Sequence, residues 1–258
     1  MSGMAVSLHD GSRQAQVSVR RAQDRGHGNF GWLNARFSFS FASYQDPAHE
    51  RFGPLRALNE DVILPGTGFG PHGHQDMEII LYPLSGTVEH RDSLGTHAIV
   101  GPGDVQRMTA GHGITHSQMN ASQSALDHHL QIWIEPSVRG LPPSVEQAHF
   151  GAAEKLNRFR LIASPDRQEG SVKLHQDARI YAALLEPGIR LSCPQGVGRR
   201  GYLHVARGLV EVHPEGEAEG LRLHGGDALK LTAISSASIV AEEPSEVLFF
   251  DLPLSPAV

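Results

Sequence analysis

Two short segments carry metal-binding side chains at the spacing of a β-strand. His72 and His74 stand one residue apart in PHGHQDMEIILYP, and His116 and Gln118 repeat this spacing in GHGITHSQ. Because successive side chains of a strand point to opposite faces, residues i and i+2 share a face and can bind one ion. If the segments are neighbouring strands, four donors meet, and a metal there keeps positions open for water, dioxygen or substrate. The alternative for an isolated pair of histidines is two polar side chains that face solvent.

The elements that must position these side chains are short strands. Apolar or alternating runs recur about every ten residues, separated by Gly, Pro, Asp and Ser. The 28 Gly and 16 Pro suit the many tight turns that such strands require. No amphipathic pattern longer than about three turns is present, although residues 144–156 (SVEQAHFGAAEKL) are compatible with a short helix. The sequence therefore predicts an all-β protein.

An internal repeat divides the chain into two halves. The segment SGTVEHRDSLGTHAIVGPGDVQRMTA, which starts at Ser85, matches ARGLVEVHPEGEAEGLRLHGGDALKLTA, which starts at Ala206. The repeat predicts two double-stranded β-helix (jelly-roll) barrels packed together: residues 1–140 with the metal site, and residues 141–258, which we expect to be metal-free. Two unrelated sandwiches would give similar strand spacing, but a chance match of the strand opening and the Gly-Asp turn is less expected. The polar candidates of the second half lack the paired spacing: Arg179, His204, His213 and His224.

Composition excludes several classes of protein. The formal net charge of -6 and the pI near 6.2 argue against a direct nucleic-acid binder, because affinity for a phosphate backbone comes mainly from clustered Lys and Arg. No stretch approaches the roughly 18 apolar residues of a membrane span, and the first residues lack the apolar core of a signal peptide. We therefore expect a cytoplasmic protein without a membrane partner. Cys193 is the only cysteine, so no intramolecular disulfide forms, and we expect a buried or half-buried thiol without a redox role.

The spacing of the histidines extends into a longer pattern that resembles a known superfamily and one of its families. The cupin superfamily consists of small β-barrels that hold a metal in their lumen, and its paired motifs combine Gly, His and Glu. The matching residues here are Gly66, His72, His74, Glu78, Gly86, Gly103, His116 and Asn120. Longer segments, among them FGWLNARFSFSFASYQDP, FGPLRALNEDVILPGTGF and LQIWIEPSVRGLPPSVEQ, resemble the pirin family of bicupins. The similarity runs from about Gly31 to the carboxyl-terminal VLFFDLP.

This resemblance implies a metal and a choice of functions. In pirins the amino-terminal barrel holds a non-haem iron through three His and one Glu, and His72, His74 and His116 match the three His by position. We therefore expect Fe²⁺, with Ni, Zn, Mn or Cu as alternatives, and a quercetin 2,3-dioxygenase-type enzyme with a small, flavonol-like aromatic substrate. Other pirins act as iron-dependent transcriptional co-regulators or redox-responsive proteins, and a few have lost the ligands. These imply two alternatives: an iron- or redox-sensing protein that binds a protein partner, and a metal-depleted pseudo-enzyme.

Gln118 departs from the family pattern, which usually has Glu at this position. A carboxylate partly neutralises Fe²⁺ and can take a proton from a substrate hydroxyl, whereas an amide offers only its carbonyl oxygen. The metal site would keep a net charge of about +2 instead of about +1, so we expect weaker metal retention and a ferrous ion that is harder to oxidise. The missing base bears on the reaction itself, because positioned acid-base help is worth about 10²- to 10⁴-fold in rate.

Glu78 is the candidate to replace the missing carboxylate, and with Gln118 it completes the set of catalytic candidates. An unbroken strand would place Glu78 on the same face as His72 and His74, where it would bind the metal or lie next to its ligands. The alternative is a Glu that is hydrogen-bonded inside the barrel near Arg91 or Arg107.

Two further features carry less weight. His112, in the loop before His116, is either a base at the mouth of the pocket or a solvated loop residue. The aromatic stretch of Trp32, Phe37, Phe39 and Phe41 is expected to be core rather than a platform for substrate. The family usually has His where Phe37 stands, so a polar role for that position is absent.

Overall fold

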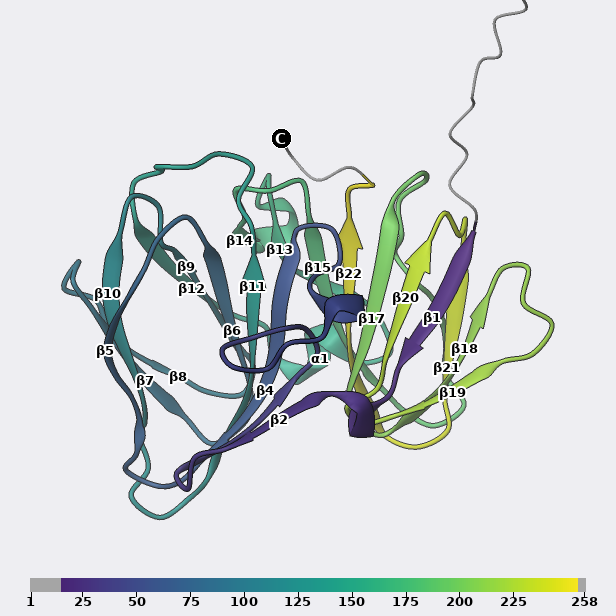
Figure 1. Cartoon of the computed structure of the whole chain (residues 1–258). Coiled ribbons are helices and arrows are strands. Elements are labelled where there is room, and N and C mark those ends of the chain that lie inside the picture. The colour runs from purple at the N-terminus through teal and green to yellow at the C-terminus, as the bar shows by residue number, and fades with distance from the viewer. Residues whose placement is uncertain (1–14, 255–258) are drawn as a thin grey trace, which may run out of the picture.

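The computed structural model describes residues 15–254 and is built almost entirely of strands. The first half forms a large sheet and a small sheet that close into a barrel (Figure 1). The large sheet has the order β12-β9-β6-β11-β4-β3-β2, with β2 (Gly26–Asn29), β3 (Leu33–Phe37), β4 (Leu55–Ile63), β6 (Glu78–Ser85), β9 (Asp104–Thr109), β11 (Asp127–Ile134) and β12 (Ser144–His149). The small sheet has the order β5-β10-β7-β8, with β5 (Gly68–His74), β7 (Val88–Asp92), β8 (His97–Val100) and β10 (Ile114–Asn120).

The second half repeats this arrangement. Its large sheet has the order β1-β20-β17-β22-β15-β13-β14, with β1 (Gln16–Arg20), β13 (Arg160–Ser164), β14 (Val172–Lys173), β15 (Arg179–Leu185), β17 (Arg200–Arg207), β20 (Ala228–Thr232) and β22 (Ser245–Leu252). Its small sheet has the order β16-β21-β18-β19, with β16 (Arg190–Ser192), β18 (Leu209–Pro214), β19 (Leu221–His224) and β21 (Ala237–Ala241). The two halves have the same strand order, so the predicted all-β pair of barrels is confirmed.

Each barrel takes one edge strand from the other predicted half of the chain. β1 pairs with β20 at the edge of the second large sheet, next to the carboxyl-terminal elements in Figure 1. β12 occupies the corresponding edge of the first large sheet, where it pairs with β9. Both strands therefore lie across the predicted boundary between residues 140 and 141. The division into 1–140 and 141–258 stays a prediction.

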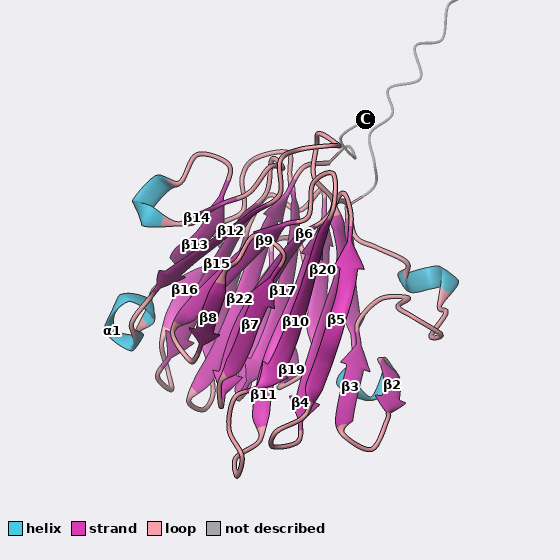
Figure 2. Cartoon of the chain, turned by 90° about the vertical axis from the view of Figure 1, so that its left-hand side faces the viewer, coloured by secondary structure: helices cyan, strands magenta, loops and turns pink. Residues whose placement is uncertain are grey.

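Helices are few and short. They are three 3₁₀ turns, η1 (Ala22–Asp24), η2 (Pro47–His49) and η3 (Gln168–Gly170), and the four-residue α1 (Ala152–Lys155), all at the margins of the strand layers (Figure 2). The short helix that residues 144–156 could hold is present as α1 at the end of this range, whereas the start of the range forms β12. The free edge of β9 draws Ser144–His149 into the sheet, where Val145 lies opposite Met108 and packs with it. Among residues 15–254, no helix is long and apolar enough to cross a membrane.

The main hydrophobic core lies between the two large sheets. In β11, Leu130, Ile132 and Ile134 point into this layer, and Tyr202 and Phe250 meet them from the second barrel. The alternate β11 side chains, those of residues 129, 131 and 133, point into the first barrel, because side chains of a strand alternate between faces. One strand thus contributes apolar groups to the interface and polar groups to the lumen.

The interiors of the two barrels differ in polarity. The second barrel is filled by one large apolar cluster, which includes Val205, Leu229 and Phe249. The first barrel has only small apolar clusters inside, next to buried polar side chains such as those of His90 and His116. Buried polar groups are costly unless something pairs with them, so this contrast identifies the first barrel as the functional one.

His204 is a titratable group between the barrels. Its side chain is completely buried on β17, and neither ring nitrogen has a hydrogen-bond partner. Burial, together with the nearby Arg25 guanidinium, lowers the pKa of His204 to about 3. In the unfolded chain a histidine titrates near 6.5. Between these two pKa values the unfolded chain binds a proton at His204 that the folded protein does not bind. The free energy of unfolding therefore decreases as the pH falls from about 6.5 towards 3.

We expect the His204→Met variant to lose part of this acid sensitivity. Below about pH 6.5, its unfolding free energy should fall less steeply than that of the wild type, by up to roughly 1.4 kcal/mol per pH unit, which is the contribution of one proton. Urea unfolding at a series of pH values measures this slope. His97→Gln, at an exposed position, is the control and should follow the wild type. Parallel curves for wild type and His204→Met would contradict the assignment.

Candidate metal centre

Strands β5 and β10 bring the three predicted histidines together. The strands pair antiparallel, with His116 directly opposite His72 and Ile114 opposite His74. The imidazole ring centroids lie 4.5 Å apart for His72 and His116, 4.9 Å for His74 and His116, and 4.8 Å for His72 and His74. One nitrogen from each ring lies within 4.8 Å of the other two. Within the described part of the chain, no other group of His, Cys, Asp or Glu has this geometry.

His72 and His116 each have a ring nitrogen available to bind an ion. Nδ1 of His72 lies 2.8 Å from the carbonyl oxygen of Gly70, so with its proton on Nδ1 this ring presents the lone pair of Nε2. Both ring nitrogens of His116 are buried without a hydrogen-bond partner. An unpaired buried polar group costs about 1–3 kcal/mol. A bound metal would remove this cost, so the residues fit one.

The local electrostatics keep the rings of His74 and His116 neutral. Burial, together with the neighbouring His72 and His74, lowers the pKa of His116 to about 3. Burial likewise lowers the pKa of His74 to about 4, with His72 adding to the effect. A metal must displace any proton on a ligand nitrogen, so imidazoles that are already neutral at neutral pH bind a cation without that competition.

Two turns hold the ends of these strands in place. After His74 the chain turns at Asp76, whose side chain accepts a hydrogen bond of 2.7 Å from the backbone N–H of Gly140 and whose own N–H donates to Gly111. Gly111 has a φ of +50°, and a Cβ there would lie 1.9 Å from the carbonyl oxygen of Leu141. Only glycine permits this contact, so the first glycine of GHGITHSQ anchors β10 to the linker.

Gln118 lies on the same face of β10 as His116 and is 2% exposed. Its Oε1 accepts a hydrogen bond of 2.9 Å from Nε2 of Gln131, and Oε1 of Gln131 in turn accepts one of 3.1 Å from the Trp133 indole. This chain orients the amide. A carbonyl oxygen has two lone pairs, so one remains available to a metal. Coordination by Gln118 stays a prediction.

Glu78 does not join the histidines. The prediction of one unbroken strand from His72 to Glu78 is wrong. β5 ends at His74, and Asp76 turns the chain with a φ of +49° before β6 begins at Glu78. The buried Glu78 carboxylate lies 3.4 Å from the backbone nitrogen and from Nδ1 of His175 in the second half. His175 also lies 3.3 Å from Thr109, to which Arg107 donates. Glu78 thus belongs to a polar network between the barrels, in the region of the predicted alternative partner Arg107.

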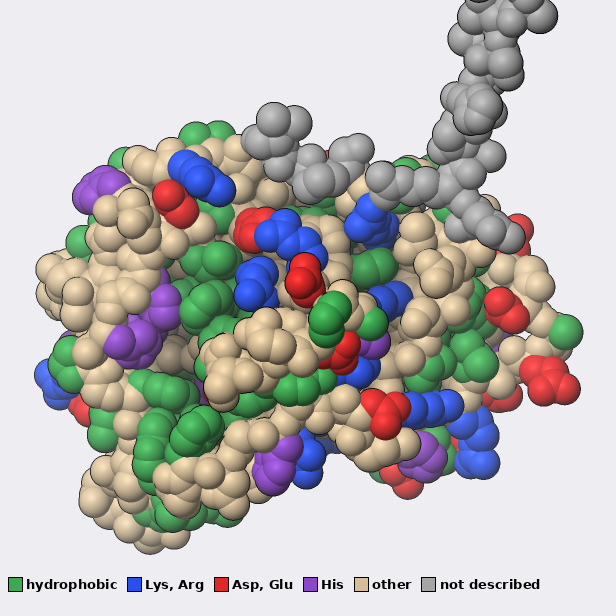
Figure 3. All heavy atoms as spheres, in the orientation of Figure 1, with side chains coloured by type: hydrophobic (Ala, Val, Ile, Leu, Met, Phe, Trp, Pro, Cys, Tyr) green, Lys and Arg blue, Asp and Glu red, His purple; other side chains and the backbone are tan. Residues whose placement is uncertain are grey.

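A pocket of about 250 Å³ opens beside the histidine cluster. Its lining combines the two half-buried metal-ligand candidates with aromatic rings and a few polar groups: Phe30, Leu33, Phe37, Phe41, Ala42, Asn59, Asp61, Phe69, His72, His74, Gln131 and Trp133. The indole of Trp133 stands perpendicular to the His74 ring, with centroids 5.1 Å apart. Figure 3 shows histidine and hydrophobic side chains exposed together on the first barrel. We call this cavity the histidine pocket.

The aromatic stretch has two roles. Phe39 lies in the core between the barrels, as expected for core. Phe37 and Phe41 stack on one another and also form a wall of the histidine pocket. The expectation of core alone was therefore incomplete. The exposed His112 is not among the residues that line this pocket.

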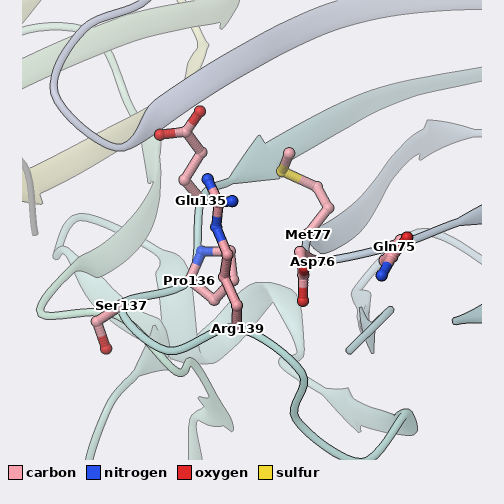
Figure 4. A pocket seen from close by; sticks show the side chains of 7 residues that line it. All are labelled: Gln75, Asp76, Met77, Glu135, Pro136, Ser137 and Arg139. Carbon is pink, nitrogen blue, oxygen red and sulfur yellow. The ribbon is translucent and has the colours of Figure 1, made fainter. Parts of the chain in front are cut away.

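A second cavity, of about 610 Å³, lies beyond the turn that follows His74. Figure 4 shows the residues around it: Gln75, Asp76 and Met77 come from that turn, and Glu135, Pro136, Ser137 and Arg139 come from the linker. It is the larger of the two, but no histidine lines it. The chemistry of the donor side chains therefore favours the smaller, histidine pocket as the site.

Sequence reasoning missed three polar residues of the histidine pocket: Asn59, Asp61 and Gln131. Asn59 and Asp61 alternate in ALNEDVI, so the pattern contained a signal of polar side chains on one strand face. The pattern does not say whether that face is the lumen or solvent, and polar residues at this spacing are normally read as exposed.

Comparisons with known proteins cover both halves. Residues 17–134 match the family model described as Pirin, and residues 161–252 match the model described as Quercetinase C-terminal cupin domain. The chain is 41% identical over 237 residues to the quercetin 2,3-dioxygenase of Escherichia coli (strain K12), a match that covers 92% of this chain and 99% of that relative.

Solved structures with a similar fold include a bacterial pirin. The bacterial pirin YhhW from Escherichia coli, in complex with nickel(II), matches with a TM-score of 0.86 at 41% identity and covers 92% of this chain and 99% of its own. A quercetin 2,3-dioxygenase from Acinetobacter baumannii matches with a TM-score of 0.73 at 21% identity, over 94% of this chain and 88% of its own. At that identity the second match supports the fold alone.

We expect His116→Ala to lose bound metal. Removal of the buried central imidazole leaves two ring donors, so metal content after gel filtration should fall at least about tenfold, the range typical for disturbed metal sites. Elemental analysis of the protein checks this. The control is His97→Ala, an exposed histidine on β8 outside the cluster, which should keep the wild-type content. Equal metal content in wild type and His116→Ala would place the metal elsewhere.

Proposed function

This chain belongs to the pirin family of bicupin proteins, and on that premise we propose that it is a metal-dependent dioxygenase of the quercetin 2,3-dioxygenase type. The observation that carries the proposal is the meeting of three imidazoles beside an aromatic-lined pocket. His72, His74 and His116 would hold the metal, with Gln118 as a weak fourth ligand. Fe²⁺ is the proposed ion, and the nickel(II) complex of a relative supports a divalent cation.

When bound, the ion supplies a positive charge and open coordination positions for a substrate oxygen and dioxygen. The chain determines on which side a substrate can approach. His72 and His74 line the histidine pocket, whereas His116 is 2% exposed and lies behind them. A molecule in the pocket therefore meets the site from the side of His72 and His74.

The shape of the pocket fits a small aromatic substrate. Its volume of about 250 Å³ is slightly below the range of the usual ligand pockets, which are about 300–1,000 Å³, so the pocket suits a small molecule. Phe37, Phe41 and Trp133 offer ring faces against which a flat molecule can stack. Asn59 and Gln131 offer hydrogen-bond donors and acceptors to its hydroxyl groups. These features support a flavonol-like substrate.

One observation favours a second candidate function. The buried amide of Gln118 cannot take a proton, so the site lacks the carboxylate that the family usually places there. A site that holds a metal without turnover would suit an iron- or redox-sensing protein that binds a protein partner. Both candidates use the same histidines, and the measurements below separate them.

Iron-loaded wild-type protein should consume dioxygen in the presence of quercetin. We expect His74→Ala to lower this rate by at least about 10²-fold, because it removes a ligand whose ring also borders the pocket. An oxygen electrode gives the rate. His112→Ala, exposed and outside the pocket, is the matched control and should keep the wild-type rate. No uptake by wild-type protein that holds iron would reject the dioxygenase and leave the sensor as the better account.

We expect Gln118→Glu to hold iron more tightly than the wild type. The added carboxylate lowers the net charge of the site and still accepts the hydrogen bond of Gln131. The apparent affinity for iron should rise about 10- to 100-fold. The iron content that remains after dialysis against a weak chelator measures this change. Gln147→Glu adds the same charge on the edge strand β12 and serves as the control. Unchanged iron retention in Gln118→Glu would show that residue 118 does not touch the metal.

A further inference from the structure

Asp61 is a carboxylate that the proposed metal ligands do not use. Of the described residues that line the histidine pocket, it is the only acidic one. It lies on β4, and its side chain is 4% exposed. Water does not stabilise the charge of a buried carboxylate in the wall of a substrate pocket. Such a group is usually paired with another polar group or has a role in binding or catalysis.

His129, which is not one of the proposed metal ligands, lies between Asp61 and the interior of the barrel. His129 on β11 stands directly opposite Asp61, and its Nε2 lies 3.7 Å from Oδ2 of Asp61. The other nitrogen of this ring, Nδ1, lies 2.7 Å from Oδ2 of Asp127. Asp127 and His129 are both completely buried. The three side chains thus form a row, Asp61, His129 and Asp127, that runs from the pocket wall into the protein.

The row has the electrostatics of a proton acceptor. Burial raises the pKa of Asp61 to about 6, opposed by His129 and assisted by the charges of Asp127 and Glu60. Burial alone would lower the pKa of His129, but the hydrogen bond to Asp127 and the two carboxylate charges raise it. Asp61 is therefore mostly ionised near pH 7, yet binds a proton far more readily than an ordinary carboxylate does.

We propose that Asp61 is the proton acceptor of the histidine pocket and takes the proton from the hydroxyl of a flavonol-like substrate. The role rests on the proposed function. The O–H bond of the substrate breaks, its electron pair stays on the substrate oxygen, and the proton forms a new O–H bond on the Asp61 carboxyl group. His129, at ion-pair distance from Asp61, and Asp127, to which His129 is hydrogen-bonded, shape the charge around this carboxylate. Gln118 cannot accept this proton, and Asp61 supplies the missing base from a different strand.

Several charged or titratable groups surround Asp61 and enter its pH dependence. They are Glu60 on its own strand, Asp127, His128 and His129 on β11, and His72 and His74 on β5 across the pocket. On the other side, β3 places the uncharged Ala35 opposite Asp61. The test therefore counts protons at one pH and compares variants that change one charge each.

The test uses iron-loaded protein without dioxygen, so that binding is observed without turnover. The probe is 3-hydroxyflavone, whose single hydroxyl gives a distinct absorption band when it ionises. At about pH 7.5 free Asp61 is ionised. We expect wild-type protein to form the flavonolate band with no net proton release, because the proton stays on Asp61. Asp61→Asn should release one proton to the solvent for each flavonolate formed. Calorimetry in two buffers of different ionisation heat counts these protons.

Glu60→Gln is the matched control. It removes one negative charge from the same strand, but Glu60 points away from the pocket and bonds to Arg25 and His128. It lowers the pKa of Asp61 by removing a nearby negative charge, but it leaves the acceptor in place, so it should still form the flavonolate band without net proton release at this pH. In air, Asp61→Asn should also lower quercetin turnover about 10²- to 10⁴-fold at unchanged iron content.

The outcomes are separable. If wild-type protein forms the band but releases a full proton, Asp61 is not the acceptor, and the band still supports the proposed substrate class. That result needs no variant, so a poorly folded Asp61→Asn would not obscure it. If wild-type protein holds iron and shows no band, the proposed substrate class and the role of Asp61 both fail.

Discussion

The packing of the two large sheets against each other is the interaction on which the rest of the structure depends. Leu130 and Ile132 of β11 meet Tyr202 and Phe250 of the second barrel in a layer that excludes water. Burial of apolar surface contributes about 25 cal/mol per Å², and this layer draws on both halves of the chain. The exchange of the edge strands β1 and β12 fastens the same two sheets. The first barrel is therefore stabilised mainly from outside its own lumen.

Because its stability comes from that outer layer, the lumen of the first barrel is free to be polar. The same strands that present Ile132 to the interface present Gln131 and Trp133 to the pocket. The second barrel shows the opposite choice, with an apolar filling around Val205 and Phe249. The two barrels share one topology but differ in role. The second is a packed apolar domain, and the first holds buried imidazoles and carboxylates. The packing between the barrels offsets the free-energy cost of desolvating those groups.

Burial then sets the chemistry of the polar lumen. It keeps His74 and His116 neutral, as a cation requires, and it raises the proton affinity of Asp61 on the opposite wall. A low dielectric strengthens each of these effects in its own direction. The amide at Gln118 fits this division, since an ion could be held on one side of the pocket while a proton is taken on the other. Metal binding and base function need not fall on one carboxylate.

Much of this could be predicted from local patterns. Alternation and turn residues predicted strands, the repeat predicted two similar barrels, and the i, i+2 spacing placed His72 and His74 on one face, because each of these depends on neighbours along the chain. The sequence could not show that Asp76 turns the backbone and carries Glu78 towards His175, or that Ser144–His149 completes a sheet edge. It also could not show that Asp61 faces the lumen and meets His129. Those facts depend on which strands become neighbours and which face is buried, and only tertiary packing decides that.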